Sequence, residues 1–457
     1  MIKQLSLTLF LLVCIAVHGK TMDPIPYQPD ATQHGPNFEI PDSQWKRAAD
    51  ARIDTYRKAD LELTIVDVNG KPLKDASVHV ELQRHAFHWG AVMGPDFLTN
   101  PNSKTLQTYF LKYFNSAGSG SGLKPKACPI EPCKENAATF LHYAADKQMV
   151  WFKKHDIPVR GHALAWEGES WLAPQMRWIY NNPDYSDREK GEKMLSRQLE
   201  HAAHAFEKWD VFCWDVVNEP RDNTLVNDML PHTDTFVETF RRAADMREKL
   251  GRGTKLYYNE NQIISFVKKV GSFEENMTIY KSRIQDLLDA GVPLDGIGFQ
   301  YRVRRYVPPE EIYRRLGEFE EFNLPYQATE FEVKPMLKTE QFSPAQKKQM
   351  VAELLTAFFS HPNATGLWCW SFMDNKKGTL PDALFSYDGE LRPEAEQWIK
   401  MMEEDFNTDA MLRLNRQGRA AVRGFKGSYG ITVKYGSKKK SFAASLLEDT
   451  KLKLICD

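Results

Sequence analysis

Residues 211–220 read Val-Phe-Cys-Trp-Asp-Val-Val-Asn-Glu-Pro. Apart from Asp215, the run before Asn218 is apolar, aromatic or cysteine, which is typical of a strand buried on both faces. Pro220 cannot continue a hydrogen-bonded ladder, so the strand ends there and leaves Glu219 at its carboxyl end. A Glu before Pro is more often a solvated loop residue, and this stretch alone does not assign it a function.

A second stretch, further along the chain, has the same feature. Residues 326–333 read Tyr-Gln-Ala-Thr-Glu-Phe-Glu-Val and deliver Glu330 near the end of a strand. Two carboxylates from separate strand ends of one barrel suit the cleavage of a glycosidic bond, which needs a proton donor on one side and an anion on the other. Our functional prediction depends on the pairing of Glu219 with Glu330.

Short apolar strands alternate with long amphipathic stretches through the middle of the chain. This alternation predicts an α/β fold, a (β/α)8 (TIM) barrel over residues 85–405 whose active face lies at the strand carboxyl ends. Helix signals include the acidic start and final Gly of residues 234–251 and the Ser343-Pro344 start of another helix. The candidate strands are residues 85–93, 109–115, 157–166, 209–218, 255–259, 296–300, 326–330 and 366–372.

Both ends of the barrel region are flanked by strand-like sequence. Residues 56–84 alternate with period 2 around a turn signal at Asn69-Gly70, and residues 406–457 are a glycine-punctuated, strand-rich region. We expect the two regions to pair as a small accessory β-domain, because each is too small to be stable alone. Residues 20–55 are rich in polar residues and Pro, and we expect an extended lead-in there.

The first residues favour export. A charged start, a mostly apolar run and a small residue describe a secretory signal over residues 1–19 that is too short to span a membrane. We therefore expect a secreted or periplasmic protein with no membrane span. The formal charge of -1, from 60 basic and 61 acidic residues, gives no reason to expect a nucleic-acid partner, and a polyanion would need a local patch. We expect a monomer.

The six cysteines do not suggest a metal site. Cys128 and Cys133 are close enough to form a disulfide in an oxidising compartment, whereas Cys213 and Cys369 lie in apolar runs that favour burial. No His or Cys spacing resembles a zinc site, so we predict no metal and no cofactor. A deacetylase or esterase would need a Ser nucleophile or a metal centre, and the sequence has no nucleophile elbow.

Four motifs resemble glycoside hydrolase family 10, the family of retaining endo-β-1,4-xylanases. They are Arg-Gly-His-Ala-Leu-Ala-Trp at 160–166, Trp-Asp-Val-Val-Asn-Glu-Pro at 214–220, Asp-Gly-Ile-Gly-Phe-Gln at 295–300 and Thr-Glu-Phe-Glu at 329–332, in the family's order. The resemblance covers residues 56–405 and implies an endo-1,4-β-xylanase acting on a xylan-like polysaccharide. In that family Glu219 matches the general acid/base and Glu330 the nucleophile, so Glu219 should have a raised pKa and Glu330 should stay anionic.

The resemblance also implies a set of substrate-binding residues. Asn218 matches the residue that holds the sugar 2-hydroxyl, and Gln300 matches a polar support close to the nucleophile. The other implied contacts are Lys124 as a donor, His162 and Trp166 from the first motif, Trp171 and Trp370 as walls, and Arg302.

Several positions depart from the family pattern. Gly120 and Ser121 replace a Glu-Asn pair, and Gly378 stands near the place of a second Trp. Glu167 replaces a His, and we interpret it as a rim glutamate paired with a basic residue. Arg302 replaces a His that hydrogen-bonds the nucleophile.

Three interpretations of Arg302 stay open. It would hold Glu330 with a two-pronged fork, receive an acidic substituent of the glycan together with Arg304 and Arg305, or pair with Glu167. These departures leave two alternatives to an ordinary xylanase. One is a hydrolase of a different or acid-decorated β-glycan, and the other is a disabled barrel that only binds glycans.

Overall fold

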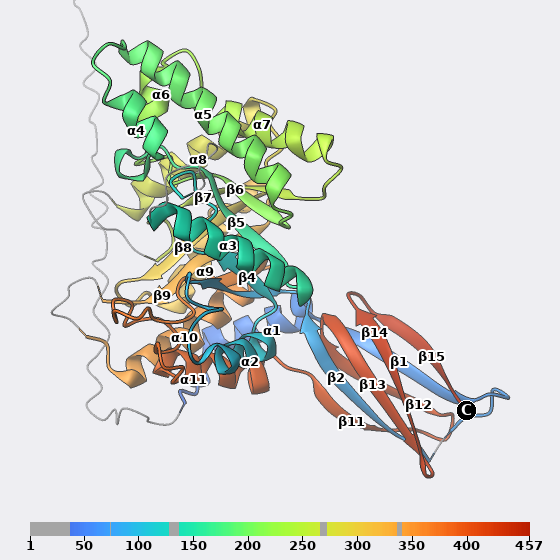
Figure 1. Ribbon diagram of the computed structural model, residues 1–457. Coiled ribbons are helices and arrows are strands. Elements are labelled where there is room, and N and C mark those ends of the chain that lie inside the picture. Colours follow the sequence, from blue (N-terminus) through green and yellow to red (C-terminus); the bar gives the residue numbers. More distant parts are fainter. Residues whose placement is uncertain (1–36, 74, 128–136, 266–271, 336–340) are drawn as a thin grey trace, which may run out of the picture.

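The computed structural model describes residues 37–457 except 74, 128–136, 266–271 and 336–340. Eight parallel strands close into one barrel in the order β10-β3-β4-β5-β6-β7-β8-β9, with helices around it (Figure 1). The predicted (β/α)8 barrel is thereby confirmed. The strands are β3 (His88–Met93), β4 (Ser116–Ser119), β5 (Val159–Ala165), β6 (Cys213–Asn218), β7 (Lys255–Glu260), β8 (Gly296–Val303), β9 (Tyr326–Val333) and β10 (Ala364–Cys369).

Two helices of the barrel begin at capping residues that the sequence predicted. Asp234 accepts hydrogen bonds from two backbone amides of the next helix, and Ser343 forms a capping box with Gln346, as the two helix signals predict. The helices of the barrel are α2 (Ser103–Tyr113), α3 (Ala137–Lys154), α4 (Pro174–Tyr180), α5 (Asp187–Lys208), α6 (Leu225–Met229), α7 (Thr235–Lys249), α8 (Phe273–Asp289), α9 (Pro309–Gly317), α10 (Pro344–Phe359) and α11 (Pro393–Lys400).

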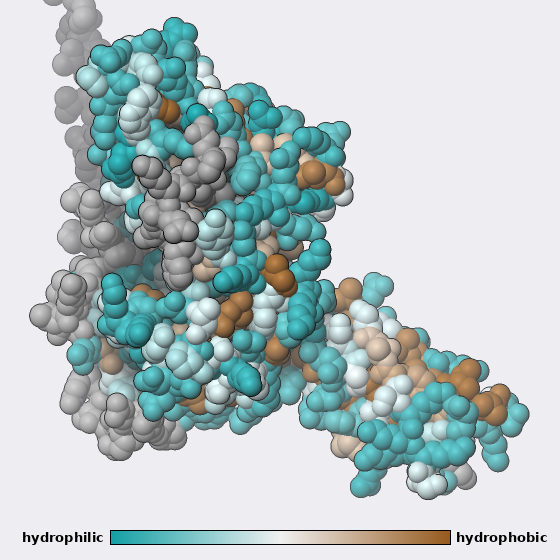
Figure 2. Space-filling model, viewed as in Figure 1, coloured by the Kyte–Doolittle hydropathy of each residue, from teal (hydrophilic) through white to brown (hydrophobic). Residues whose placement is uncertain are grey.

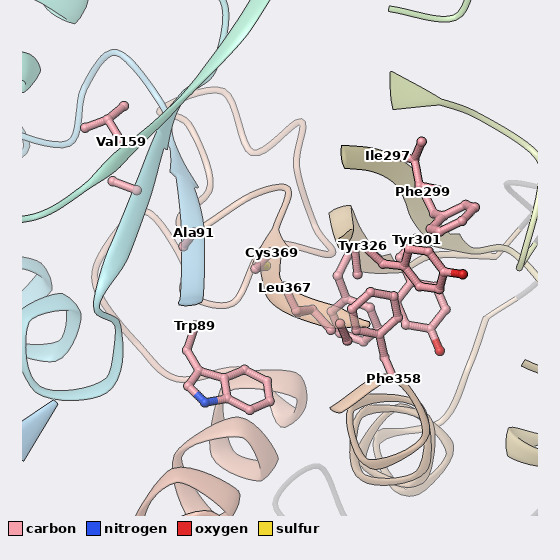
Figure 3. Close-up of a cluster of buried hydrophobic side chains, with 14 of the residues drawn as sticks. Trp89, Ala91, Val159, Ile297, Phe299, Tyr301, Tyr326, Phe358, Leu367 and Cys369 are labelled. Carbon is pink, nitrogen blue, oxygen red and sulfur yellow. The ribbon is translucent and has the colours of Figure 1, made fainter. Parts of the chain in front are cut away.

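The core lies between the barrel strands and the helices around them. Figure 3 shows aromatic side chains of β8 and β9 facing Phe358 of α10. The ring centroids of Tyr301 and Phe358 lie 5.8 Å apart, and those of Phe299 and Tyr326 lie 5.5 Å apart with their planes perpendicular. Such close aromatic packing fixes β8 and β9, and these strands carry the side chains on which the candidate site depends.

The strand predicted at residues 109–115 is wrong. Most of it belongs to α2, in which Leu106 and Phe110 are four residues apart and both are buried. The true strand is β4, which reads Ser-Ala-Gly-Ser. Small residues carry no apolar strand signal, whereas the neighbouring aromatic run does, so the sequence pattern predicts the strand in the wrong place.

The extended lead-in predicted for residues 20–55 is wrong for residues 44–55. Residues 44–57 form helix α1 (Gln44–Arg57), capped by Ser43. Ala49 and Ile53, four residues apart, are its buried side chains, and Ile53 joins the main core. Two apolar residues in a polar stretch were too weak a pattern to predict this helix.

The terminal strands form two sheets that project from one end of the barrel (Figure 1). One sheet has the order β12-β1-β15 and the other β11-β2-β13-β14, and their inward side chains share one hydrophobic cluster, so we call them the sandwich. The predicted pairing of the two chain ends is confirmed. The strands are β1 (Lys58–Asp67), β2 (Ser77–His85), β11 (Asp409–Arg413), β12 (Arg419–Phe425), β13 (Gly427–Tyr435), β14 (Lys438–Leu446) and β15 (Thr450–Cys456).

The Asn69-Gly70 signal does not make a hairpin. Gly70 has φ 81° and its amide donates to the Asp67 carbonyl, so a turn is present. However, β1 and β2 lie in different sheets, because each finds its partners among the C-terminal strands instead. Within the described ranges, no helix is long and apolar enough to cross a bilayer.

Candidate active site

Glu219 directly follows β6 and Glu330 lies near the end of β9, so both stand at the carboxyl face of the barrel. Both have left-handed backbone conformations, with φ of 53° and 59°. A non-glycine residue in this region stores roughly 1–3 kcal/mol of strain, which is found mostly at functional sites. Around Glu330 the pairing of β8 with β9 skips an extra residue on β9, so a bulge sets the direction of this side chain.

The Glu219 carboxylate is surrounded by neutral donors. Gln300 Nε2 donates to Oε1 at 2.6 Å, while Trp166 Nε1 at 3.1 Å and Asn223 Nδ2 at 3.3 Å donate to Oε2. Burial and then the negative charge of Glu330 raise the pKa of Glu219, and these effects outweigh the hydrogen bonds. A carboxyl group that retains its proton at higher pH is suited to donate it to a leaving oxygen.

Ion pairs surround the Glu330 carboxylate. Arg302 donates to Oε2 from Nε, at 2.9 Å, and from Nη2. The same guanidinium donates from Nη1 to Glu332 Oε1 at 2.6 Å, and Arg304 donates to that oxygen too. Glu330 Oε1 faces His162 Nε2 at 3.8 Å and is the oxygen that Arg302 leaves free. Arg302 therefore holds one oxygen of Glu330 and leaves the other for the sugar.

These contacts test two of the three interpretations of Arg302. Burial lowers the pKa of Arg302, but the charges of Glu330 and Glu332 raise it further, so this side chain is always a cation. Its Nε, Nη1 and Nη2 atoms each donate to a carboxylate of the protein, as the interpretation with a two-pronged fork on Glu330 predicts. The interpretation in which it pairs with Glu167 is wrong.

Glu167 is not a rim residue either. It is 1% exposed and accepts from Thr235 Oγ1 at 2.7 Å, Gln198 Nε2 at 3.0 Å and the Asn227 amide at 3.0 Å. All three donors are neutral. Burial raises the pKa of Glu167 to about 7 in spite of these bonds. Its carboxyl group joins the β5 loop to α5, α6 and α7, which is a structural role, and the predicted basic partner is wrong.

His162 is buried, and Asp215 holds its ring. Its Nδ1 lies 2.6 Å from Asp215 Oδ2, an oxygen that also accepts from Arg160. Burial, and then the charge of Lys124, lowers the pKa of His162 well below its usual value, so the ring is neutral. The acceptor at Nδ1 assigns the ring proton to that atom, which leaves Nε2, on the side of Glu330, as an acceptor.

Three tryptophans and a lysine form the wall of the site. Trp166 stacks on Trp171 with 4.1 Å between ring centroids, and Trp370 lies edge-on to His162 at 5.9 Å. Lys124 Nζ lies 4.5 Å from the ring centroid of Trp166 and 5.4 Å from that of Trp370. Burial lowers the pKa of Lys124 to about 8, against the opposing charges of Glu330 and Glu219. These rings provide apolar faces on which sugar rings can stack.

Two amide side chains complete the site. Asn218 Oδ1 accepts from Asn259 Nδ2 at 2.8 Å, whereas its buried Nδ2 has no hydrogen-bond partner among the described residues. A buried donor without a partner is suited to a ligand hydroxyl, which fits the role implied for Asn218. Gln300 was expected close to the nucleophile, but its amide contacts Glu219 instead.

Sequence reasoning missed two further carboxyl groups. Glu332 follows Glu330 by two residues on β9, and Arg302 binds both carboxylates. Glu260 ends β7, is completely buried, and accepts from Tyr258 Oη and the Asn261 amide. Burial raises the pKa of Glu260 to about 8. The strand-end position that revealed Glu219 would have revealed Glu260 too.

Other departures lie at the edge of the site or outside it. Gly120 follows β4 and Ser121 is exposed, so no carboxylate is presented at this point, and Gly378 forms a turn with φ 65°.

Cys213 and Cys369 are buried free thiols, as predicted. The proposed pair Cys128 and Cys133 and the signal at residues 1–19 lie outside the described residues. Within the described ranges, no group of three or more His, Cys, Asp or Glu residues is arranged to hold a metal ion.

Comparisons with known proteins agree with the geometry. Residues 79–393 match the model of Glycosyl hydrolase family 10. The anti-sigma-I factor RsgI6 of Acetivibrio thermocellus is 25% identical over 398 residues, which cover 87% of this chain and 48% of that protein. Endo-1,4-beta-xylanase 1 of Arabidopsis thaliana is 24% identical over 389 residues, which cover 85% of this chain and 38% of that protein. The chain thus spans about half, or less, of the length of these relatives.

Solved structures support the fold. Xylanase 10B from Thermotoga petrophila RKU-1, in complex with xylobiose, superimposes with a TM-score of 0.56 at 19% identity. The match covers 70% of this chain and 95% of that one. The barrel accounts for the shared part, and the extra strands at both ends of this chain pack as the sandwich.

Proposed function

This chain belongs to glycosyl hydrolase family 10, and from that premise we propose that it is a retaining endo-1,4-β-xylanase. One observation carries the proposal. Two glutamates stand at the ends of β6 and β9 in different surroundings. Glu219 accepts from neutral donors and has a pKa raised by burial and by the charge of Glu330, whereas Glu330 is bound to a permanent cation. A double displacement requires one carboxyl group that donates a proton and one carboxylate that attacks the anomeric carbon.

The proposed reaction has two steps. In the first, Glu330 Oε1 attacks the anomeric carbon, the glycosidic C–O bond breaks, and the leaving oxygen takes the proton of Glu219. In the second, Glu219 accepts a proton from water as the water oxygen attacks the anomeric carbon and the bond to Glu330 breaks. Esterification removes the negative charge of Glu330, which lowers the pKa of Glu219 and allows it to act as the base.

The surroundings suit an extended sugar chain. Asn218 Nδ2 donates to the hydroxyl beside the reacting carbon, His162 Nε2 accepts from a hydroxyl, and the rings of Trp166 and Trp370 carry the sugar faces. Lys124 lies between these two rings and adds a donor. The xylan specificity and the endo mode are proposals that rest on relatives named as xylanases.

The test is the product of xylan digestion. We expect the chain to release xylo-oligosaccharides of several lengths from unsubstituted 1,4-β-xylan, and proton NMR to detect the β-anomer first, before mutarotation. A first product with the α configuration would contradict the retaining mechanism. Digestion of acid-decorated or mixed-linkage β-glycans alone would contradict the xylan specificity and leave the hydrolase assignment standing.

A second candidate function is glycan binding without turnover. It is favoured by the relative named as an anti-sigma-I factor, whose name denotes regulation rather than hydrolysis. A protein of this kind would bind xylo-oligosaccharides and release no reducing ends above those of the Glu330→Gln variant. Calorimetric binding together with this rate comparison separates the two functions.

We also propose that the protein is exported, on the apolar run within residues 1–19. Expression of the complete sequence in a secreting host, followed by N-terminal sequencing of the protein in the medium, tests this proposal. A protein that stays inside the cell with Met1 and the apolar run retained would contradict it.

A further inference from the structure

The C-terminal region, which supplies five of the seven strands of the sandwich, differs in charge from the rest of the chain. Residues 406–457 contain eleven Lys and Arg against four Asp and Glu, whereas the rest of the chain has 49 against 57. The near-zero net charge of the whole chain therefore hides a basic C-terminal region. Figure 2 shows the sandwich as a separate lobe beside the barrel, with hydrophilic residues over much of its surface.

Strand register brings three of these cations into one row. Lys434 on β13 lies opposite Lys439 on β14 and opposite Ser77 on β2, and Ser77 lies opposite Arg413 on β11. All three cationic residues are exposed, while the neighbours of Lys434 and Ser77 along the strands, Val433 and Val78, are buried. The row crosses the outer face of the four-stranded sheet. We call Arg413, Lys434 and Lys439 the basic row.

The basic row lies at the end of the sandwich away from the barrel. β2 runs toward the barrel and reaches His85 just before β3 begins at His88, so Ser77 marks the far end. On the other sheet, Arg419 and Lys453 flank Thr64 at the same end, because β1 leaves the barrel side at Lys58. Both outer faces thus carry cations far from Glu219 and Glu330.

The basic row is energetically unfavourable in isolation. Like charges directly opposite each other on a sheet are destabilising, as Lys434 and Lys439 are here. No carboxylate of the described residues forms an ion pair with any member of the row. Other sandwich cations do have partners, since Arg423 pairs with Asp54 and Asp60, Lys451 with Glu62, and Lys440 with Asp457. The charges of the row are therefore available to an external anion.

The surface next to the row differs between the strands. On β13 and β14 the cross-strand pairs are small, namely Thr432 with Ser441, Gly430 with Ala443, and Ser428 with Ser445, whereas His79, Glu81 and Met411 lie on the same face of β2 and β11. Small side chains and hydroxyl groups leave room for an extended polymer to lie along β13 and β14 and hydrogen-bond. Such a surface suits a flexible chain with many hydroxyl groups and regularly placed charges.

We propose that the basic row is a second binding site, for the carboxylate groups of an acidic polysaccharide. The choice of a polysaccharide rests on the proposed function of the barrel, which acts on the same class of polymer. In the active site the charge of Arg302 is already paired with Glu330 and Glu332 through Nε, Nη1 and Nη2, so we expect an acidic substituent to be bound elsewhere. The sandwich would hold the polymer by its charges while the barrel takes a neutral part of the main chain.

The experiment compares two triple variants of the full chain. The first, Arg413→Gln with Lys434→Gln and Lys439→Gln, neutralises the basic row. The second, Arg423→Gln with Lys440→Gln and Lys451→Gln, removes the same charge from cations that already have partners. Binding is measured by affinity electrophoresis and calorimetry on glucuronoxylan, on its carboxyl-reduced form, on duplex DNA and on vesicles containing phosphatidylserine.

We expect the first variant to bind glucuronoxylan about ten-fold more weakly at low ionic strength, and the second to match the wild type. The difference should vanish on the carboxyl-reduced polymer and at high salt. The melting temperature of the first variant should not fall, because the substitutions relieve a repulsion between exposed groups. This control separates lost binding from lost folding.

Three results would overturn the proposal. They are equal weakening in both variants, equal binding of the native and carboxyl-reduced polymers, or tighter row-dependent binding to DNA or vesicles than to glucuronoxylan. Hydrolysis of neutral xylo-oligosaccharides, measured in parallel, reports on the barrel alone. Failure of the proposed function and failure of the second site therefore give different results.

Discussion

The Glu219 side of the site is built from neutral hydrogen-bond donors, whereas the Glu330 side is built from ion pairs. Around Glu219 the donors are Trp166, Asn223 and Gln300, and the buried carboxyl of Glu260 lies close by. Around Glu330, Arg302 binds two carboxylates at once and Arg304 supports the second of them, Glu332. The two glutamates thus have different electrostatic surroundings, and burial and the charge of Glu330 raise the pKa of Glu219.

A single strand supplies both sides. Gln300 and Arg302 are two residues apart on β8, so their side chains leave the strand on the same face. Gln300 reaches Glu219 and Arg302 reaches Glu330. The role of each glutamate is therefore set by the neighbours that its carboxyl group contacts. Substitutions on the Glu219 side and on the Glu330 side can test this.

Removal of the Glu330 carboxylate should have the largest effect. We expect Glu330→Gln to lower kcat about 10⁴-fold or more, because no covalent intermediate can form. In Glu330→Gly, sodium azide should restore turnover. Azide forms a bond to the anomeric carbon as the glycosidic C–O bond breaks and the leaving oxygen takes the proton of Glu219, so the product should be a stable α-glycosyl azide of inverted configuration. A β-glycosyl azide would contradict the role of Glu330 as nucleophile.

Substitution of Glu219 should give a smaller loss that depends on the leaving group. We expect Glu219→Gln to lower kcat about 10²- to 10⁴-fold on xylan, where the leaving oxygen needs a proton. On a dinitrophenyl xylobioside, which needs none, the first step should stay fast and a burst of dinitrophenol should precede slow release. Equal losses on both substrates would mean that the two sides do not divide the chemistry as proposed.

The fold was largely readable from the sequence because its signals are local and repeated. Apolar strands alternating with amphipathic helices predicted the barrel, and the caps at Asp234 and Ser343 predicted two helix starts. The errors fall where the local signal is weak or where distant partners decide. β4 is a strand of small residues, and β1 and β2 separate because their partners lie at the other end of the chain.

The site was only partly readable, because side-chain partners come from different strands. The strand-end positions of Glu219 and Glu330 followed from the sequence, and the fork of Arg302 was one of three interpretations that the sequence left open; the structure brings these residues to one face. The partner of Gln300 and the burial of Glu167 did not. Both depend on the packing of neighbouring loops and helices, which no local pattern records.

The Arg302 fork can be removed without touching either catalytic glutamate. We expect Arg302→Gln to lower kcat about 10²-fold, since a nucleophile displaced by about 1 Å loses that much. The unpaired carboxylates should also lower stability by about 3–5 kcal/mol, measured by urea unfolding. Arg302→Lys keeps the charge but not the fork, so its kcat should lie between those of wild type and Arg302→Gln. A kcat within a few-fold of wild type in Arg302→Gln would mean that Glu330 is held by other contacts.

Lys124 is influenced by both sides, because the charges of Glu219 and Glu330 both act on it. We expect Lys124→Met, which keeps the apolar stem over Trp166, to raise KM about ten-fold with a smaller change in kcat. The pKa of Lys124 is about 8, so wild-type KM should rise through that pH while the KM of the variant stays flat. KM measured at pH 6 and pH 9 checks this, and an equal ratio at both would contradict it.

The smallest expected effects are on stability, and the contributions of Glu260 and Glu332 to stability should change with pH in opposite directions. Glu260 has a pKa raised from its usual 4.5 to about 8, so it is neutral when folded and ionised when unfolded between these values. Its contribution to stability is therefore greatest below pH 4.5 and falls as the pH rises toward 8, by on the order of 5 kcal/mol at most. Glu260→Gln should gain in melting temperature relative to wild type as the pH rises from 5 to 8.

Glu332 should behave in the reverse way. Burial raises its pKa, but Arg302 and Arg304 lower it further, so the net shift is downward. Its contribution to stability is then present above pH 4.5 and is lost as the pH falls through the lowered pKa. Glu332→Gln should be destabilised at pH 6 and should approach wild type on acidification below pH 4.5, in melting curves of the same series. If the two variants shifted in the same direction with pH, the neutral and ionic sides would not be electrostatically distinct, and the division of roles between Glu219 and Glu330 would lose its physical basis.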